Sequence, residues 1–156
     1  MQISDLLSPE AVVASLKAKD KKQLLQHLAD RAAQITRVPS ARILETLVER
    51  ERLGTTGVGQ GIAIPHGRLA EIKKISGIFA RLDTPIEYDA VDNQPVELVF
   101  MLLAPEGSGA DHLKALARVS RLLRNQAACD KLRKAASAEA LYAILTEPSG
   151  ASSVAA

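Results

Sequence analysis

A nearly unbroken apolar run, Val-Glu-Leu-Val-Phe-Met-Leu-Leu at residues 96–103, constrains the fold of this chain more than any other segment. A strand that is apolar on both faces is typical of the centre of a sheet whose two faces are both covered. We therefore expect residues 96–103 to form a central strand, with helices packed against each side of it.

Helical and extended patterns surround this run and complete an α/β fold. A capping pattern at Asp20 and apolar residues at helical spacing predict a helix over 21–35. Further helices are expected from residue 40 to the stop at Gly54, from Asp111 onward with Leu113 on its buried stripe, over 129–135 and over 138–145. Strands are expected at 12–16, 61–65 and 76–82, with Tyr88 on a short edge strand.

This order of elements predicts one α/β domain over residues 1–146. We expect a single-domain sandwich in which a mixed, approximately five-stranded sheet is flanked by helices on both faces. The residues from 147 to 156 are small and polar, and we expect them to form a disordered tail.

Composition excludes several classes of function. A net charge of +2 and only 3% aromatic residues argue against nucleic-acid binding. No apolar run approaches the roughly 20 residues of a membrane span, so no direct membrane insertion is expected. The first residues lack a signal-peptide pattern, and the single Cys129, which we expect to be buried, fits a reducing compartment. We expect a cytoplasmic protein.

The segment Gly-Ile-Ala-Ile-Pro-His-Gly-Arg, residues 61–68, is the leading candidate for a functional site. Pro65 lacks an N–H and suits the end of a strand, and Gly67 allows a turn or a close approach of the backbone. His66 would therefore lie where a strand leaves its sheet, held by the fold and open to a ligand. The alternative is a structural histidine that bonds a carbonyl at the strand end.

A loop rich in glycine, residues 55–61, precedes this segment and could form a pocket wall. Its spacing does not match the dinucleotide fingerprint, and neither a P-loop nor a nucleophile elbow is present. Two isolated histidines and one cysteine are too few for a zinc site, so we expect neither metal nor cofactor. The backbone N–H groups and hydroxyls of the glycine loop could still face an anion. The candidates for phosphate binding are Thr55, Thr56, Gly57 and Gly67.

Two further side chains could join His66. His112 follows Asp111 at the expected start of a long helix, where free N–H groups and a positive dipole suit a phosphate. Arg50 closes the helix before the glycine loop and could reach toward His66 with a guanidinium fork. In isolation each could equally be a solvated residue at a helix end. His27 lies off the leucine face of its helix and is expected at the surface.

Two motifs give the chain a resemblance to a known family. The run Arg-Glu-Arg-Leu-Gly-Thr-Thr-Gly-Val-Gly-Gln-Gly-Ile-Ala-Ile-Pro-His-Gly-Arg at residues 50–68 and the run beginning Asp-His-Leu-Lys at residue 111 carry it. They resemble the active-site region of phosphotransferase-system enzyme IIA proteins of the fructose/mannitol type, EIIA type-2, and within them the nitrogen-regulatory branch. The resemblance spans about residues 4–145, and the family fold agrees with the sandwich expected above.

The resemblance implies a phosphoryl-accepting regulatory protein. It implies that His66 is phosphorylated by a phosphohistidine on an HPr-like phosphocarrier protein, NPr, and that His112 and Arg50 are the family's second histidine and pocket arginine. Nε2 would attack while a carbonyl holds the proton on Nδ1; the turn after Gly67 is one candidate for it, and the sequence does not identify which carbonyl it is. Apolar neighbours such as Ile64 and Leu53, and acids such as Glu51, are candidate contacts for the carrier.

Two alternatives stay open from the sequence. One is an IIA component of a fructose- or mannitol-like sugar transport system. The other is a sensory binding module in which His66 never transfers phosphate. For the regulatory branch, the phosphorylation state is expected to control partner proteins, among them potassium-transport or sensor-kinase components.

Overall fold

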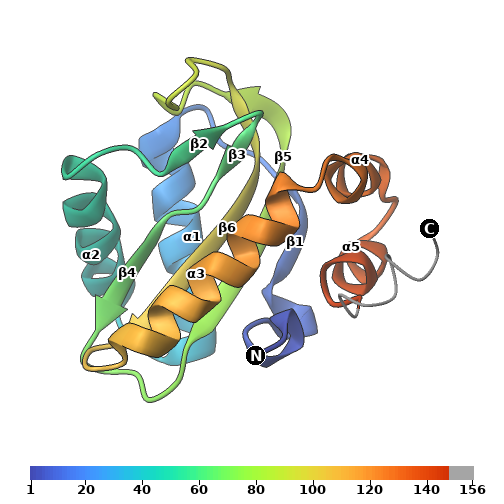
Figure 1. Cartoon of the computed structure of the whole chain (residues 1–156). Coiled ribbons are helices and arrows are strands. Elements are labelled where there is room, and N and C mark those ends of the chain that lie inside the picture. Colours follow the sequence, from blue (N-terminus) through green and yellow to red (C-terminus); the bar gives the residue numbers. More distant parts are fainter. Residues whose placement is uncertain (148–156) are drawn as a thin grey trace.

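The computed structural model describes residues 1–147 and forms one α/β sandwich (Figure 1). The prediction of a disordered tail concerns residues 147–156 and, apart from Glu147, lies outside the described residues. The strands are β1 (Val12–Leu16), β2 (Gly57–Gly59), β3 (Ile62–Ala63), β4 (His66–Leu69), β5 (Ser76–Ile86) and β6 (Val96–Pro105). The helices are α1 (Lys21–Thr36), α2 (Ser40–Arg52), α3 (Gly109–Arg124), α4 (Gln126–Lys134) and α5 (Ala138–Leu145), with short 3-10 turns at Ile3–Asp5 and Pro9–Ala11.

The apolar run at residues 96–103 lies in β6, at the centre of the sheet as expected. The strand order is β1-β5-β6-β3-β2, and β4 also pairs with β6. β5 runs antiparallel to β6, whereas β3 and β4 run parallel to it, so the sheet is mixed. Residues 98–104 of β6 are completely buried. Figure 1 shows α3 across one face of the sheet and α1 behind the other.

The sequence placed most helices closely but missed details of the sheet. Six strands form instead of about five, because β2 and β4 are too short to leave a pattern. The edge strand proposed at Tyr88 is wrong: Tyr88 lies in the connection after β5 and is fully buried. The cap of α1 forms as expected, because the Asp20 carboxylate accepts the N–H of Gln23 at 2.8 Å.

The buried stripe of α3 differs from the predicted one. Leu113 is 66% exposed, and the inward-facing residues are His112, Ala115, Val119 and Leu123. Consecutive helical residues are rotated by about 100°, so a histidine on the inner face turns the next leucine outward. The prediction failed because it assigned the buried stripe by hydrophobicity and left a histidine out of it.

Candidate functional site

His66 is the first residue of β4 and lies directly after a break between β3 and β4. β3 and β4 both run along β6, but Ile64 and Pro65 interrupt them. Pro65 cannot donate to a sheet ladder, and its carbonyl accepts the N–H of Leu102 at 3.0 Å. The interruption turns the carbonyl of Ile64 toward the His66 ring. His66 therefore begins a strand after the break, where the sequence had placed it at the end of one.

The two nitrogens of His66 have different partners. Nδ1 lies 2.8 Å from the carbonyl oxygen of Ile64, which can only accept, so Nδ1 carries the proton. Nε2 then has a free lone pair, which accepts the Nε–H of Arg50 at 3.2 Å. The fixing carbonyl thus precedes the histidine by two residues, and the expectation of one after Gly67 is wrong. The ring is half-buried.

Arg50 comes from the last turn of α2 and is held at both ends. Besides its bond to His66, its Nη1 donates to the carbonyl oxygen of Gly54 at 2.8 Å, just beyond the helix. This second bond orients the guanidinium plane so that Nε–H points at the imidazole. The sequence prediction that Arg50 reaches over to His66 is confirmed in position.

His112 packs against His66 from α3. The ring centroids are 5.6 Å apart with an interplanar angle of 73°. Its backbone N–H is not free, because it donates to the carbonyl of Ser108 at 2.9 Å inside the helix. His112 can therefore contribute only its side chain to the site, which is the group that the sequence analysis considered as a donor.

Arg68 is a neighbour of the site that the sequence analysis did not single out. Its Nε–H donates to Nδ1 of His112 at 3.3 Å, so the proton of the neutral His112 ring is on Nε2. This Nε2 is buried and has no hydrogen-bond partner among residues 1–147. The only signal in the sequence was the position of Arg68 two residues after His66, which places both side chains on one face of β4.

Both imidazoles are kept neutral. Burial lowers the pKa of His66, and the nearby Arg50 adds to this effect, while the bond to Ile64 opposes it. Burial also lowers the pKa of His112, helped by His66 and Arg68. A neutral His66 is a nucleophile and a neutral His112 is a hydrogen-bond donor at Nε2.

The predicted phosphate-binding residues of the glycine loop already have partners. The Thr56 hydroxyl is buried between the carboxylate of Glu51 and the hydroxyl of Tyr88, and its N–H donates to Glu51 at 3.1 Å. The Thr55 hydroxyl accepts the N–H of Gly57 at 3.1 Å. These bonds fix the shape of the loop and occupy the Thr56 hydroxyl and the Gly57 N–H.

Gly57 and Gly67 lie at positions where a side chain would not fit. A Cβ on Gly67 would lie 2.4 Å from Cγ2 of Thr46 in α2, and one on Gly57 would lie 2.8 Å from Cβ of Ala90. Glycine at 67 lets α2 lie directly on β4, which brings Arg50 within reach of His66.

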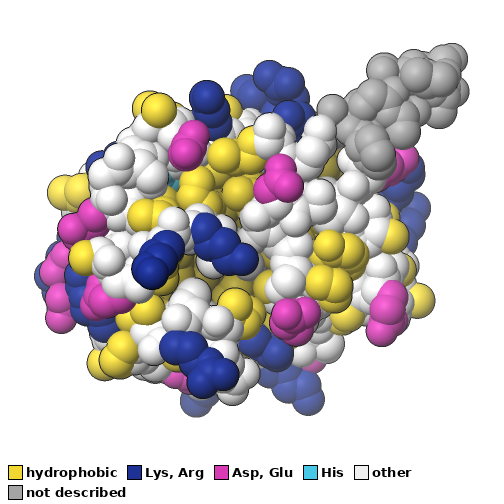
Figure 2. Space-filling model, turned by 90° about the horizontal axis from the view of Figure 1, so that it is seen from below, with side chains coloured by type: hydrophobic (Ala, Val, Ile, Leu, Met, Phe, Trp, Pro, Cys, Tyr) yellow, Lys and Arg dark blue, Asp and Glu magenta, His cyan; other side chains and the backbone are white. Residues whose placement is uncertain are grey.

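The surface around His66 combines exposed leucines with basic side chains. Leu53 is 84% exposed just after α2, and Leu113 is exposed on α3 next to His112. Figure 2 views the molecule from the end at which α3 begins and shows hydrophobic side chains lying among both basic and acidic ones. Of the carrier contacts proposed from the sequence, Ile64 is buried and the side chain of Glu51 is only 7% exposed, so both offer little surface to a partner, whereas Leu53 is open to one.

Other features limit the chemistry of the site. Cys129 is buried, as expected, with its thiol donating to the carbonyl of Leu123 at 3.2 Å. Within residues 1–147 no group of three or more His, Cys, Asp or Glu side chains is placed to hold a metal ion. No helix in this part of the chain is long and apolar enough to cross a membrane.

Comparison with known proteins agrees with this fold. Residues 5–147 match the model of the family described as phosphoenolpyruvate-dependent sugar phosphotransferase system, EIIA 2. A nitrogen regulatory protein of Bradyrhizobium diazoefficiens is 55% identical over 95% of this chain and 97% of its own length. One from Escherichia coli is 40% identical over 96% of this chain and 93% of its own. The crystal structure of nitrogen regulatory protein IIA-Ntr from Neisseria meningitidis superposes with a TM-score of 0.88 at 36% identity, covering 92% of this chain and 99% of that one.

The chain belongs to the EIIA type-2 family of the phosphotransferase system. Within this family it is a homologue of the nitrogen regulatory proteins, which it matches over nearly its whole length. The resemblance identified from the two sequence motifs is confirmed.

Proposed function

We propose that this protein is a phosphoryl carrier of a nitrogen-type phosphotransferase system, and that His66 accepts the phosphoryl group. The observation that carries this proposal is the pair of bonds on the His66 ring. The carbonyl of Ile64 holds the proton on Nδ1, so the lone pair of Nε2 faces the arginine and outward from β4. A structural histidine would need only the first of these bonds.

The donor in this proposal is a phosphohistidine on an HPr-like carrier, NPr. The Nε2 lone pair of His66 attacks phosphorus while the bond from phosphorus to the carrier's imidazole breaks, and that imidazole keeps the bonding electron pair. Throughout the transfer the proton stays on Nδ1 of His66, which donates it in a hydrogen bond to the Ile64 carbonyl. The new and the broken bonds are of the same kind, so the transfer is reversible and needs no change in oxidation state.

Arg50 has two successive roles in this mechanism. Before transfer, its Nε–H bonds Nε2 and holds the ring in line. When phosphorus occupies Nε2 that bond is lost, and the guanidinium can instead donate to a phosphoryl oxygen. Charge spreads over the three oxygens in the transition state, so positioned donors supply most of the catalysis.

His112 supplies a second donor. Its buried Nε2–H lacks a partner within residues 1–147, and leaving such a group unpaired costs about 1–3 kcal/mol. A phosphoryl group on the adjacent His66 would bring oxygens close to it. Arg68 acts as a positioning residue, because its bond to Nδ1 of His112 sets the proton on the other nitrogen. We assign the phosphate contacts to Arg50 and His112, and we assign loop shaping to Thr55, Thr56 and Gly57, with Gly67 giving the close approach of α2.

The phosphorylation state would then govern the binding of partner proteins, among them potassium-transport or sensor-kinase components. Loss of the Arg50–His66 bond and addition of a dianion at the surface change both the shape and the charge of the region between Leu53 and Leu113. The full-length match to nitrogen regulatory proteins favours this role over that of a sugar-transport component.

The test is phosphorylation in a defined mixture of enzyme I, the HPr-like carrier and phosphoenolpyruvate, followed by intact-protein mass spectrometry. The wild-type chain should gain one phosphoryl group, and only when the carrier is present. His66→Ala should gain none, whereas His27→Ala, which removes a half-exposed histidine of α1, should behave as wild type. A His66→Ala protein that is still phosphorylated would refute the assignment, and rapid transfer onward to a fructose or mannitol permease would favour the sugar-transport alternative.

A further inference from the structure

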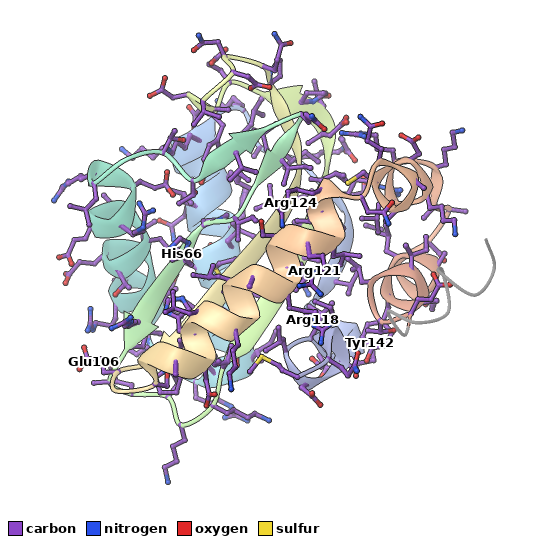
Figure 3. The ribbon with its side chains drawn as sticks, viewed as in Figure 1. His66, Glu106, Arg118, Arg121, Arg124 and Tyr142 are labelled. Carbon is purple, nitrogen blue, oxygen red and sulfur yellow. The ribbon has the colours of Figure 1, made fainter. Side chains whose placement is uncertain are left out.

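A second site lies on the opposite side of α3 from His66. A cavity of about 260 Å³ opens where α3, α4, α5 and the N-terminal segment meet. In Figure 3, Arg118 and Arg121 lie on the side of α3 toward α5, whereas His66 lies on the side toward β4. The lining residues of this cavity play no part in the proposed phosphoryl transfer.

The cavity has an apolar floor and a basic rim. Ile3, Leu122 and Leu145 form part of the floor, and Leu145 is 1% exposed. The basic residues of the lining are Arg118 and Arg121 from α3 and Lys131 from α4. Residues 118, 121 and 122 of α3 and Asn125 directly after it repeat at helical spacing, so one stripe of the helix faces the cavity.

The charge of this region departs strongly from that of the rest of the chain. Residues 109–134 contain seven Lys or Arg and two Asp, which gives a net charge of +5. Since the whole chain carries +2, all other residues together carry −3. Arg118, Arg121 and Lys131 form no ion pair or side-chain hydrogen bond with any of residues 1–147. Like charges held close together are unfavourable unless a counter-charge lies between them.

We propose that this cavity binds a small phosphate monoester whose organic part is apolar or aromatic. Three cations and the single acid of the lining, Glu147, leave a local charge of +2. A phosphate monoester carries about −1.5 to −2 at neutral pH and presents three acceptor oxygens. Two arginines from one helix stripe provide planar forks for those oxygens, and the apolar floor would cover the organic part.

The size of the cavity restricts the ligand. Sites for drug-sized molecules usually enclose about 300–1,000 Å³. At about 260 Å³ this cavity is slightly smaller than that range, so a nucleoside monophosphate fits the volume better than a dinucleotide cofactor. The rim cations come from two different helices, so the ligand would bridge α3 and α4.

Adenosine monophosphate is a suitable probe, with adenosine and inorganic phosphate as its two separated halves. Titration of the full chain, followed by ¹H–¹⁵N NMR and calorimetry, should place the largest shifts at the cavity-lining stripe of α3 and at α4. The intact probe should bind about tenfold or more tightly than either half, because adenosine lacks the charge-assisted bonds and inorganic phosphate lacks the contact with the apolar floor. The double variant Arg118→Gln, Arg121→Gln should weaken binding about tenfold or more.

A matched double variant separates this site from a general attraction of anions to a basic surface. Lys114→Gln with Arg124→Gln removes the same charge from exposed positions of α3 outside the cavity, and binding should be retained. Equal weakening by the two double variants, adenosine binding as tightly as its monophosphate, or no binding at millimolar probe would each overturn the proposal. Repeating the titration on the His66→Ala variant tests the cavity in a protein that lacks the proposed phosphoryl acceptor, so the result does not depend on the phosphoryl-carrier function.

Discussion

Two adjacent residues at the end of α2 serve two different networks. Arg50 bonds His66 at the surface, and Glu51 points to the other side of the helix into a buried cluster. Glu51 accepts from Thr56 and from Tyr88, whose hydroxyl lies 3.3 Å away, and pairs with Lys21 at 2.8 Å. Lys21 also lies over the Tyr88 ring, 4.4 Å from its centroid.

The two networks have different roles: the one around Glu51 stabilises the fold, and the one around His66 is suited to phosphoryl transfer. Around Glu51 the acceptors and donors are matched, and the groups come from α1, α2, the loop before β2 and the segment after β5. Around His66 the donors exceed the acceptors, because Arg50, Arg68 and His112 surround two imidazole rings. A network in which every donor has an acceptor stabilises the fold, whereas a network with surplus donors can bind an anion.

The largest expected effect on stability is at Glu51. Glu51→Ala should lower the free energy of unfolding by about 3–4 kcal/mol, because it removes the carboxylate partner of Lys21 and leaves the buried hydroxyls of Thr56 and Tyr88 with only each other as partners. The neighbouring exposed Glu49→Ala should change it by less than about 0.5 kcal/mol. Urea unfolding of both variants measures the difference, and equal effects would show that the Glu51 cluster is not a support.

The largest expected effect on transfer, after loss of His66 itself, is at Arg50. Arg50→Gln should slow phosphoryl transfer from the carrier by about 10²–10³-fold, the usual result of removing one transition-state donor. Its unfolding free energy should change far less than that of Glu51→Ala. Stopped-flow or quenched-flow transfer kinetics provide the rate, and a rate within twofold of wild type would remove Arg50 from the mechanism.

A smaller effect is expected at Gly67. Gly67→Ala forces a methyl group against Thr46 and should cost about 1–3 kcal/mol of stability by pushing α2 from β4. Since α2 carries Arg50, transfer should also slow. The double variant with Thr46→Ser removes the clashing Cγ2 and should restore most of both losses. No rescue by the second substitution would mean that Gly67 acts through its backbone and not through packing.

The smallest expected effect is on pH dependence. Burial lowers the pKa of both His66 and His112 below the value of about 6.5 in an unfolded chain. The unfolded state therefore binds more protons as pH falls below about 6.5, so stability is lost progressively from there until the folded-state pKa values are passed. Unfolding measured between neutral pH and mild acid should show this loss, and His66→Ala with His112→Gln should reduce it. An unchanged slope in that double variant would contradict the shifts.

Local sequence patterns were sufficient to predict where the helices lie and to single out His66. The Pro65-His66-Gly67 sequence marked the site because proline and glycine restrict the backbone in known ways, and β6 was evident from its apolar run. Contacts between distant segments were not readable. The role of Ile64 as acceptor depends on a break in the sheet, and the bond from Arg68 to His112 joins β4 to α3. The bond between the hydroxyls of Thr56 and Tyr88 was not readable either, because the two residues are 32 positions apart in the chain.

The most direct test of the account is to locate the phosphoryl group on the protein. ³¹P and ¹⁵N NMR of the chain labelled at histidine nitrogens, after phosphorylation by the carrier, distinguish the two nitrogens of each ring. We predict a single phosphorus–nitrogen bond at Nε2 of His66, with the proton still on Nδ1 beside the Ile64 carbonyl. Phosphorus on Nδ1 of His66, or on either nitrogen of His112, would contradict it.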